Sequence, residues 1–390
     1  MGIIALAVNV LSHEAFGYGL MYTPQISLEE NYNDNIFFTP NKPVSDLVNV
    51  VNGGTAIDLS TERDELTFNG NLTNTTYLKN HEQDDTDFSV RANESHMLSE
   101  RLNIVTNAGY IKDSSPDRDL ESTGLILGTS VRKTTNYSLK GMYSLSELLS
   151  TDITYGYENQ RFNTDQFVDS SSQNIDMGYT IDAGSIVNET SLRLDLLYER
   201  DKYLNSLLQK ADTYEWRAGA SHQMTELMYF SFYVGTSQTI SSYLIPILWF
   251  ELEEKNHSRG IIGQLTLGYK TEYTDSTVSL SRNIASVSGE AYLSERTMAT
   301  IDSSLTISRT VKASLSAQYI MNKETGNNAS QENIQQFTMN LSPGLRIELS
   351  DDFFLSLSHI YSQLRDQGNS ITYRRNLSTL NIEYRHSFFN

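Results

Sequence analysis

The sequence predicts an all-β fold, a transmembrane antiparallel up-and-down β-barrel. Apolar and polar residues alternate with a period of two in many segments along the chain. The mean hydropathy is −0.40, which is too polar for a bundle of membrane helices. Outside the N-terminus there is no run of about 18 apolar residues that could form such a helix. A barrel meets all three conditions, because only every second side chain of its strands faces lipid.

The last segment of the chain, Asn376–Phe388, shows the alternation most clearly. One side of the predicted strand is apolar and aromatic: Leu380, Ile382, Tyr384, His386 and Phe388. The other side is polar: Asn381, Glu383, Arg385 and Ser387. In a lipid-embedded barrel the first side faces acyl chains, the second faces water, and aromatic residues lie at the membrane interfaces.

Charged residues on another segment indicate that the inner side of the barrel lines water. Arg193 and Asp195 alternate with the leucines of Leu192–Tyr198. An Arg that faced the bilayer midplane would cost ~2–4 kcal/mol, so this side must be wet. The candidate lumen-lining charges are Arg193, Asp195, Glu199, Glu383 and Arg385. The Ser, Thr, Asn and Gln residues on the same side suit the passage of hydrated, sugar-like solutes.

The connections between predicted strands fall into two classes. Short turns such as Leu98–Arg101 alternate with longer loops such as Asn31–Leu47 and Ile240–Asn256. Bacterial barrels have short periplasmic turns and long outer loops, so both termini are expected on the periplasmic side. This arrangement requires an even number of strands. We predict about 18, with 16 or 20 as alternatives, since Thr134–Asn136 and Glu147–Ser150 cannot both be inner turns.

Residues 1–17 differ from the rest of the chain. They contain the apolar run Gly2–Leu11, and the small residues Ala15 and Gly17 precede Tyr18. This pattern is typical of a secretory signal peptide, although the positive segment that normally opens one is missing. We therefore expect the true start to lie further upstream. No break in composition divides residues 18–390, which are predicted to form a single barrel domain.

One predicted outer loop is apolar. The run Tyr243–Phe250 includes Tyr243, Pro246, Trp249 and Phe250. It is interpreted as a strand that extends past the membrane or a hydrophobic loop that packs on a neighbouring loop. The alternative is a constriction loop that folds into the lumen or over its mouth. Pro246 disfavours a regular central strand at this place.

The composition argues against several function classes. The formal net charge of −19 disfavours nucleic acid, whose phosphates require a basic surface. The absence of Cys excludes disulfide scaffolds and thiolate metal sites. His359 and His386 are interpreted as interfacial aromatic residues, and no nucleophile motif accompanies His81 or His257, so the protein is not expected to be an enzyme. We assign no catalytic residue, no cofactor and no metal site.

Acidic clusters recur in the predicted outer loops, for example within Glu82–Asp87 and Asp113–Glu121. Carboxylates can bind Ca²⁺ or bridge divalent ions to lipopolysaccharide, but neither cluster has the spacing of a defined calcium loop. We interpret them as solvated loops. Outer-membrane lipids and lipopolysaccharide are the partners that the predicted location implies.

The segment Pro24–Ile36 ends in Tyr32-Asn33-Asp34-Asn35-Ile36. It resembles the Tyr-x-Asp-Asn-Ile turn of the β-barrel porin 2 family of outer-membrane proteins. Ser279–Asn283, followed by Ser286 and Gly289, resembles a late strand and loop of the same family. The family is found with exopolysaccharide-export and exosortase loci, and the resemblance implies polysaccharide and a periplasmic export protein as partners. It supplies no catalytic residues.

For Tyr32, Asp34, Asn35 and Ile36 a structural role is favoured, because Asp and Asn side chains in turns bond to nearby backbone.

Three functions follow from these observations. The first is a polar-lumened outer-membrane barrel that passes, or helps to secrete, a surface exopolysaccharide. The second is a general diffusion porin for small hydrophilic solutes. The third is a structural or docking barrel for a periplasmic partner.

Overall fold

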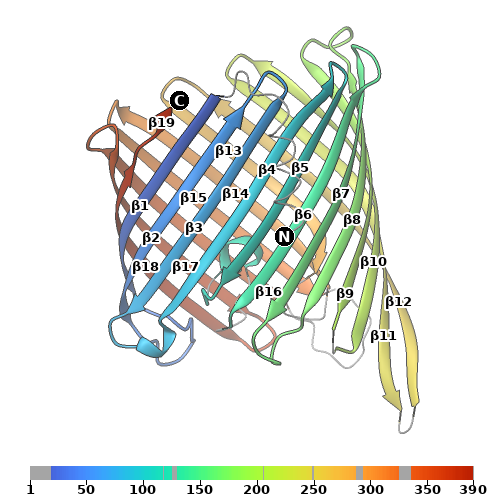
Figure 1. Ribbon diagram of the computed structural model, residues 1–390. Helices are drawn as coiled ribbons and strands as arrows, with labels where there is room; N and C mark the ends of the chain where they lie inside the picture. Colours follow the sequence, from blue (N-terminus) through green and yellow to red (C-terminus); the bar gives the residue numbers. More distant parts are fainter. Residues whose placement is uncertain are drawn as a thin grey trace.

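The computed structural model describes residues 19–389, apart from 117, 125–129, 205, 248–249, 287–292 and 325–334. The predicted signal peptide lies outside these residues and stays a prediction. The described chain forms a closed antiparallel barrel of 18 strands, so the predicted fold class is confirmed (Figure 1). Within the described ranges, no helix has the length and apolar character needed to cross a membrane.

The strands follow one another around the ring in chain order. The first half contains β1 (Gly19–Asn33), β2 (Asp46–Ser60), β3 (Asp64–Tyr77), β4 (Asp85–Ser99), β5 (Leu102–Asp113), β6 (Arg132–Ser144), β7 (Leu149–Phe162), β8 (Ser170–Asp182) and β9 (Thr190–Tyr203). The second half contains β10 (Leu208–Thr225), β11 (Met228–Ile247), β12 (Phe250–Lys270), β13 (Thr274–Ser286), β14 (Leu293–Ser308), β15 (Val311–Glu324), β16 (Gln335–Glu348), β17 (Phe353–Asp366) and β18 (Ile371–Arg385). The two-residue β19 (Phe388–Phe389) follows β18 along the same edge of β1, so it adds no further strand to the ring of 18. Two short helices lie in loops: η1 (His81–Gln83) and α2 (Leu120–Thr123).

The ring closes between the first and last strands. The ladder of β1 and β18 runs from Gln25↔Arg385 to Asn33↔Leu377. After a break, β19 resumes pairing with β1, and the ring of Phe388 stacks 6.2 Å from that of Tyr22. The apolar, aromatic-ended last segment is therefore the strand that seals the barrel.

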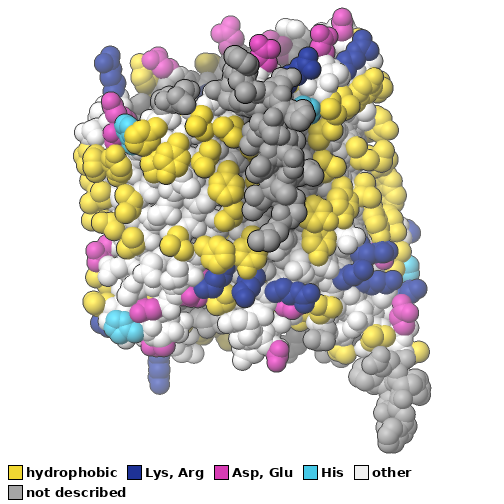
Figure 2. Space-filling view, viewed as in Figure 1, with side chains coloured by type: hydrophobic (Ala, Val, Ile, Leu, Met, Phe, Trp, Pro, Cys, Tyr) yellow, Lys and Arg dark blue, Asp and Glu magenta, His cyan; other side chains and the backbone are white. Residues whose placement is uncertain are grey.

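The wall is apolar outside and polar inside, as the period of two predicts. In β9, Leu192, Leu194 and Leu196 are each at least 45% exposed. Arg193 and Asp195, between them, form an ion pair with each other. Figure 2 shows the band of apolar side chains on the outer surface. Large apolar side chains on the outside of a closed barrel mark a surface made for lipid.

One rim of the barrel carries short turns, and both ends of the sheet lie there, where β1 begins and β19 ends (Figure 1). We call it the short-turn rim, and the opposite one the long-loop rim. Leu145–Leu148 forms one of the short turns and Thr134–Asn136 lies inside β6, which decides between the two alternatives left open by the sequence.

The predicted loop Ile240–Asn256 is mostly strand, so this boundary is corrected. The pairing of β11 with β12 continues from Met228↔Tyr269 to Ile247↔Phe250. Figure 1 shows the resulting hairpin, which projects beyond the long-loop rim. By contrast, the ladder of β12 with β13 ends at Gly263↔Arg282, so the outer part of the hairpin continues without that neighbour. The sequence of Ile240–Ile247 does not show an alternation of apolar and polar residues, because most of its residues are apolar, and the strand was therefore not predicted.

Candidate functional site

One side of the lumen carries a ladder of opposite charges on β6 to β9. The guanidinium of Arg193 donates to Asp152 at 2.8 Å and to Asp195 at 2.7 Å. Lys140 approaches Asp152 to 3.6 Å from the other side. Next along the wall, Ser172 donates to the carboxylate of Glu199 at 3.2 Å. The strand register places the predicted residues Arg193, Asp195 and Glu199 on the lumen side, and Arg193 has opposite charges on both flanks.

The predicted residues Glu383 and Arg385 lie on β18, near the short-turn rim. The carboxylate of Glu383 forms an ion pair with the guanidinium of Arg346 of β16 at 3.2 Å and lies 3.9 Å from that of Arg385. Both guanidinium groups lie over the ring of Phe354, 4.3 and 5.3 Å from its centroid. These charges are therefore held together by one another and by an aromatic ring.

The loop between β5 and β6 crosses the lumen, which the sequence interpretation missed. Its short helix α2 lies within the ring of strands (Figure 1). Asn322 of β15 donates to the backbone oxygen of Thr123 at 2.6 Å, and Thr338 of β16 donates to that of Gly124 at 2.6 Å. Because β15 and β16 lie far around the ring from β5 and β6, this loop, which we call the inward loop, docks on the opposite wall.

An apolar contact anchors the same loop. Leu120 is 0% exposed and packs against Leu364 of β17 and Phe38 of the β1–β2 loop. Phe38 stacks on Tyr373 of β18, with 6.1 Å between the ring centroids. The guanidinium of Arg375 lies 5.6 Å from the Phe38 ring. Two loops thus meet on one side of the lumen around a small core.

Gly124 ends α2 in the left-handed backbone region, with φ of 71°. A Cβ at this position would come within 3.1 Å of Ile320 and Thr338 on the barrel wall. Glycine is required here for both reasons, since it adopts positive φ without penalty and permits a close approach of the backbone.

Buried charges brace the near end of the inward loop. Arg132 of β6 donates to Asp119 at 2.8 Å. Arg118 donates to the backbone oxygen of Ser130 at 2.6 Å, and its side chain is 4% exposed. Burial, followed by repulsion from Arg132, lowers the pKa of Arg118 below its ordinary value. A guanidinium nevertheless stays charged at neutral pH, so the loop is pinned by charge-assisted bonds.

The turn Tyr32–Ile36, which resembles the motif of the porin family, connects the end of β1 to β18 through hydrogen bonds. The carboxylate of Asp34 accepts from the backbone and side-chain nitrogens of Asn376, each at 2.7 Å. Asn35, 2% exposed, donates to the backbone oxygen of Arg374 at 2.9 Å. Ile36 packs on Val48, and Tyr32 is 52% exposed on the outer wall. These contacts are the kind that a structural role requires.

The predicted constriction is Tyr243–Phe250, and its described residues, 243–247 and 250, do not fold into the lumen. Its backbone pairs within the β11–β12 hairpin up to Ile247↔Phe250, and this hairpin leaves the rim. Tyr243 packs against a buried cluster that includes Tyr203 and Leu293 at the long-loop rim. Pro246 lies opposite Glu251 in the hairpin, and Trp249 lies outside the described residues. The structure favours the alternative hypothesis, a strand that extends past the membrane.

The signal that could have identified the inward loop is weak. Leu120 and the run Leu125–Leu127 are apolar residues in a segment otherwise rich in charge and hydroxyl groups. The partners of Leu120 are far away in the chain, so no local pattern connects them.

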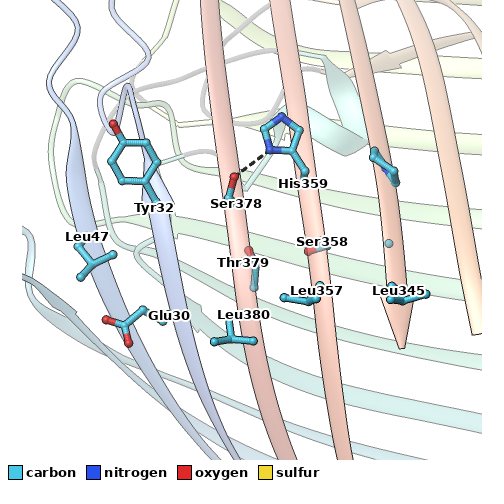
Figure 3. A pocket seen from close by; sticks show the side chains of 12 residues that line it. Glu30, Tyr32, Leu47, Leu345, Leu357, Ser358, His359, Ser378, Thr379 and Leu380 are labelled. Atoms are coloured by element: carbon cyan, nitrogen blue, oxygen red, sulfur yellow. Dashed lines mark hydrogen bonds between the residues drawn. The ribbon is translucent and has the colours of Figure 1, made fainter. Parts of the chain in front are cut away.

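A separate hollow of about 550 Å³ lies on the outer wall over β16 to β18 and β1 (Figure 3). Leu345, Leu357 and Leu380 line it, and the Nδ1 of His359 bonds to the hydroxyl of Ser378 at 2.9 Å. Leu357 and Leu380 are outward-facing side chains, so this hollow is part of the lipid-facing surface and does not belong to the lumen.

The arrangement is a barrel with a polar inner wall and a loop that lies across its lumen. Within the described residues, no three His, Asp or Glu side chains come together as a set that could hold a metal ion. What the lumen side chains can do is exchange hydrogen bonds and charge contacts with a passing solute.

Comparison with known proteins agrees on the fold. No family model matches the chain, and no curated protein matches it. Pseudomonas aeruginosa OccK2 (OpdF) is similar in structure, with a TM-score of 0.51 and 7% identity over 95% of this chain and 98% of that one.

Two further Pseudomonas aeruginosa barrels show comparable coverage. OpdK has a TM-score of 0.49 and 8% identity over 94% of this chain and 99% of its own. OprD has a TM-score of 0.48 and 10% identity over 94% of this chain and 95% of its own. The likeness to OccK2 (OpdF) shows a shared barrel fold, whereas the resemblance to an export-associated family rests on the quoted motifs alone.

Proposed function

We propose that this protein is an outer-membrane channel for the passive diffusion of small hydrophilic solutes. The observation that carries this proposal is the inward loop, which crosses the lumen and docks on β15 and β16 through Asn322 and Thr338. Such a loop reduces the cross-section and sets an upper limit on solute size, while the polar wall keeps the remaining path wet.

The lumen favours solutes that carry hydroxyl groups or charge. Opposite charges face each other along the wall at Arg193 and Asp152, and again at Arg346 and Glu383. A solute with both donors and acceptors can replace some of these contacts in turn without a large desolvation cost. OccK2, which has this fold, has been crystallised in complex with glucuronate, and a sugar acid is accordingly a good first probe.

Location and orientation belong to the same proposal. The apolar outer band suits a membrane, and closed barrels of this kind span the bacterial outer membrane. The long-loop rim would face outward and the short-turn rim, with both ends of the sheet, would face the periplasm.

Export of a surface polysaccharide is the second candidate, favoured by the resemblance of Tyr32–Ile36 to export-associated barrels. A polymer must keep a continuous path open along its whole length, and the docked inward loop opposes this.

The test is the swelling of liposomes that contain the purified barrel. We expect monosaccharides and glucuronate to enter, and uptake to fall sharply for oligosaccharides. A deletion strain should retain its surface polysaccharide. Loss of the polysaccharide, together with a barrel that admits no monosaccharide, would overturn the proposal in favour of export.

A further inference from the structure

In the described strands, the cations at outward-facing positions lie toward the long-loop rim. Outward-facing strand positions next to the long-loop rim carry Lys112, Lys133, Arg161, Lys202, Lys210, Arg365 and Arg374. The corresponding positions next to the short-turn rim carry apolar residues such as Leu59, Leu102, Tyr269 and Tyr384. Figure 2 shows a row of Lys and Arg along the edge of the apolar band.

Some of these cations oppose one another directly. Lys202 of β9 pairs with Lys210 of β10, and Lys133 of β6 pairs with Arg161 of β7. Like charges at opposed positions of neighbouring strands are destabilising. An anion that lies against the wall would remove this repulsion.

Arg365 and Arg374, like Lys133, Lys202 and Lys210, form no ion pair with an acidic side chain in the described part of the chain, whereas Lys112 is paired with Asp85. Asp366, which follows Arg365 in the chain, bonds to Asn369, and Asp34 bonds to Asn376, two residues beyond Arg374. Arg161, by comparison, is bonded to Asp169 at 3.0 Å.

A hollow of about 440 Å³ surrounds the two arginines. It is lined by Gln363, Arg365, Gln367, Ser370, Thr372 and Arg374. Cross-strand pairing of Arg374 with Gln363, and of Arg365 with Thr372, keeps these donors side by side on β17 and β18. Guanidinium and amide donors without an acidic partner suit a phosphate group.

Apolar surface adjoins the arginines on the membrane side. A second hollow, of about 280 Å³, shares Gln363, Arg365 and Gln367 and adds Tyr319, Phe337 and Met339. Along β18, Leu380 in the hollow of Figure 3 lies six residues beyond Arg374, which is about 20 Å of extended strand. The hollow lined by Arg365 and Arg374 is thus followed by two apolar hollows in the direction of the membrane interior.

We propose that this patch binds the phosphorylated head of lipid A, the membrane anchor of lipopolysaccharide, with its acyl chains along the adjoining hollows. The inference rests on the outer-membrane location proposed above and is independent of the channel activity. Lipid A, unlike phosphatidylglycerol, carries more than one phosphate on a wide sugar head, which matches cations spread over neighbouring strands.

The experiment compares the purified full-length barrel with the variant R365Q/R374Q. Binding of lipid A is measured by native mass spectrometry and by titration in detergent. The matched control is R101Q/R309Q, which makes the same chemical change at exposed short-turn residues. We expect the affinity of R365Q/R374Q for lipid A to fall roughly tenfold or more, and that of the control to stay at the wild-type value.

Two further arms identify the ligand. Dephosphorylated lipid A should bind the wild type as weakly as intact lipid A binds R365Q/R374Q, and phosphatidylglycerol should compete poorly. Unchanged binding by R365Q/R374Q, equal binding of the dephosphorylated lipid, or equally tight binding of phosphatidylglycerol would each overturn the proposal. Resistance of the folded barrel to SDS on unheated gels shows that the variant is folded. Sugar uptake by the same samples separates this result from the channel proposal.

Discussion

Asn322 donates a hydrogen bond from Nδ2 to the backbone oxygen of Thr123 at 2.6 Å, although the two residues are 199 positions apart. This contact joins the inward loop to the opposite wall of the barrel. Thr338 adds a second bond to the same loop, at Gly124, and Leu120 adds an apolar anchor. The position of the inward loop thus depends on a few contacts that can be removed one at a time.

The double variant N322A/T338V should release the inward loop. Both side chains are almost fully buried, and each donates to a loop carbonyl that would lose its partner. The loss of two such bonds is worth ~1–3 kcal/mol, which is enough to populate an undocked loop. We expect higher and noisier single-channel conductance in planar bilayers. N52A/T73V is the control, because Thr73 donates to Asn52 on the lumen wall away from the loop. Equal conductance of both variants would show that the loop does not narrow the channel.

The variant L120A should expose the loop to protease. Leu120 is 0% exposed, and the truncation of a buried Leu costs ~2–5 kcal/mol. The cost falls on the docking of the loop, because the strands of the barrel retain their pairing. The peptide bond after Arg118, whose side chain is 4% exposed in the native barrel, should then be cut by trypsin. L194A, at a lipid-facing position that is 56% exposed, should be cut no faster than the wild type. Trypsin resistance of L120A would mean that the hydrogen bonds alone hold the loop.

The variant G124A should weaken the same docking by ~1–2 kcal/mol, because alanine is strained at positive φ and its Cβ would meet Ile320 and Thr338 at 3.1 Å. G53A provides a direct control, since a Cβ at Gly53 has nothing within 4 Å. The rate of trypsin cleavage after Arg118 is again the readout. Identical rates for G124A and G53A would contradict the close approach seen at Gly124.

The variant R193Q should make the channel more selective for cations. Removal of this guanidinium leaves Asp152 and Asp195 on the lumen wall without their shared partner. The reversal potential under a KCl gradient should shift toward that of K⁺, and D195N should shift it in the opposite direction. R309Q, a change in a short turn, should leave the potential where it is. If R193Q and R309Q gave the same potential, ions would not pass close to this wall.

Shortening the β11–β12 hairpin should leave conductance unchanged. Replacement of Leu244–Glu253 by Asn-Gly keeps the pair Tyr243↔Glu254 and closes it with a two-residue turn. Because this part of the hairpin projects beyond the rim, its removal should not widen the path. Single-channel recording of the shortened protein checks this, and a clear rise in conductance would restore the constriction hypothesis for Tyr243–Phe250.

Much of the architecture could be predicted because it repeats locally. The alternation of Leu192, Leu194 and Leu196 with Arg193 and Asp195 needs only the geometry of one strand to assign an oily side and a wet side. The even strand number follows from the alternation of short turns and long loops, whereas only the structure decided between Thr134–Asn136 and Glu147–Ser150 as the place of an inner turn. The apolar run Tyr243–Phe250 could not be assigned in this way, because hydrophobicity alone does not distinguish a hairpin that extends past the rim from a loop that folds into the lumen.

By itself, the sequence determined that the chain is a closed barrel with a wet interior, since that property depends on neighbours in the same strand. Only the tertiary structure decided which loop narrows the lumen and where cations collect on the outer wall. Leu120 meets Leu364, and Arg365 lies beside Arg374, only after the ring has closed and the register of β17 with β18 is set. Contacts between distant segments depend on this global register, and no local periodicity records it.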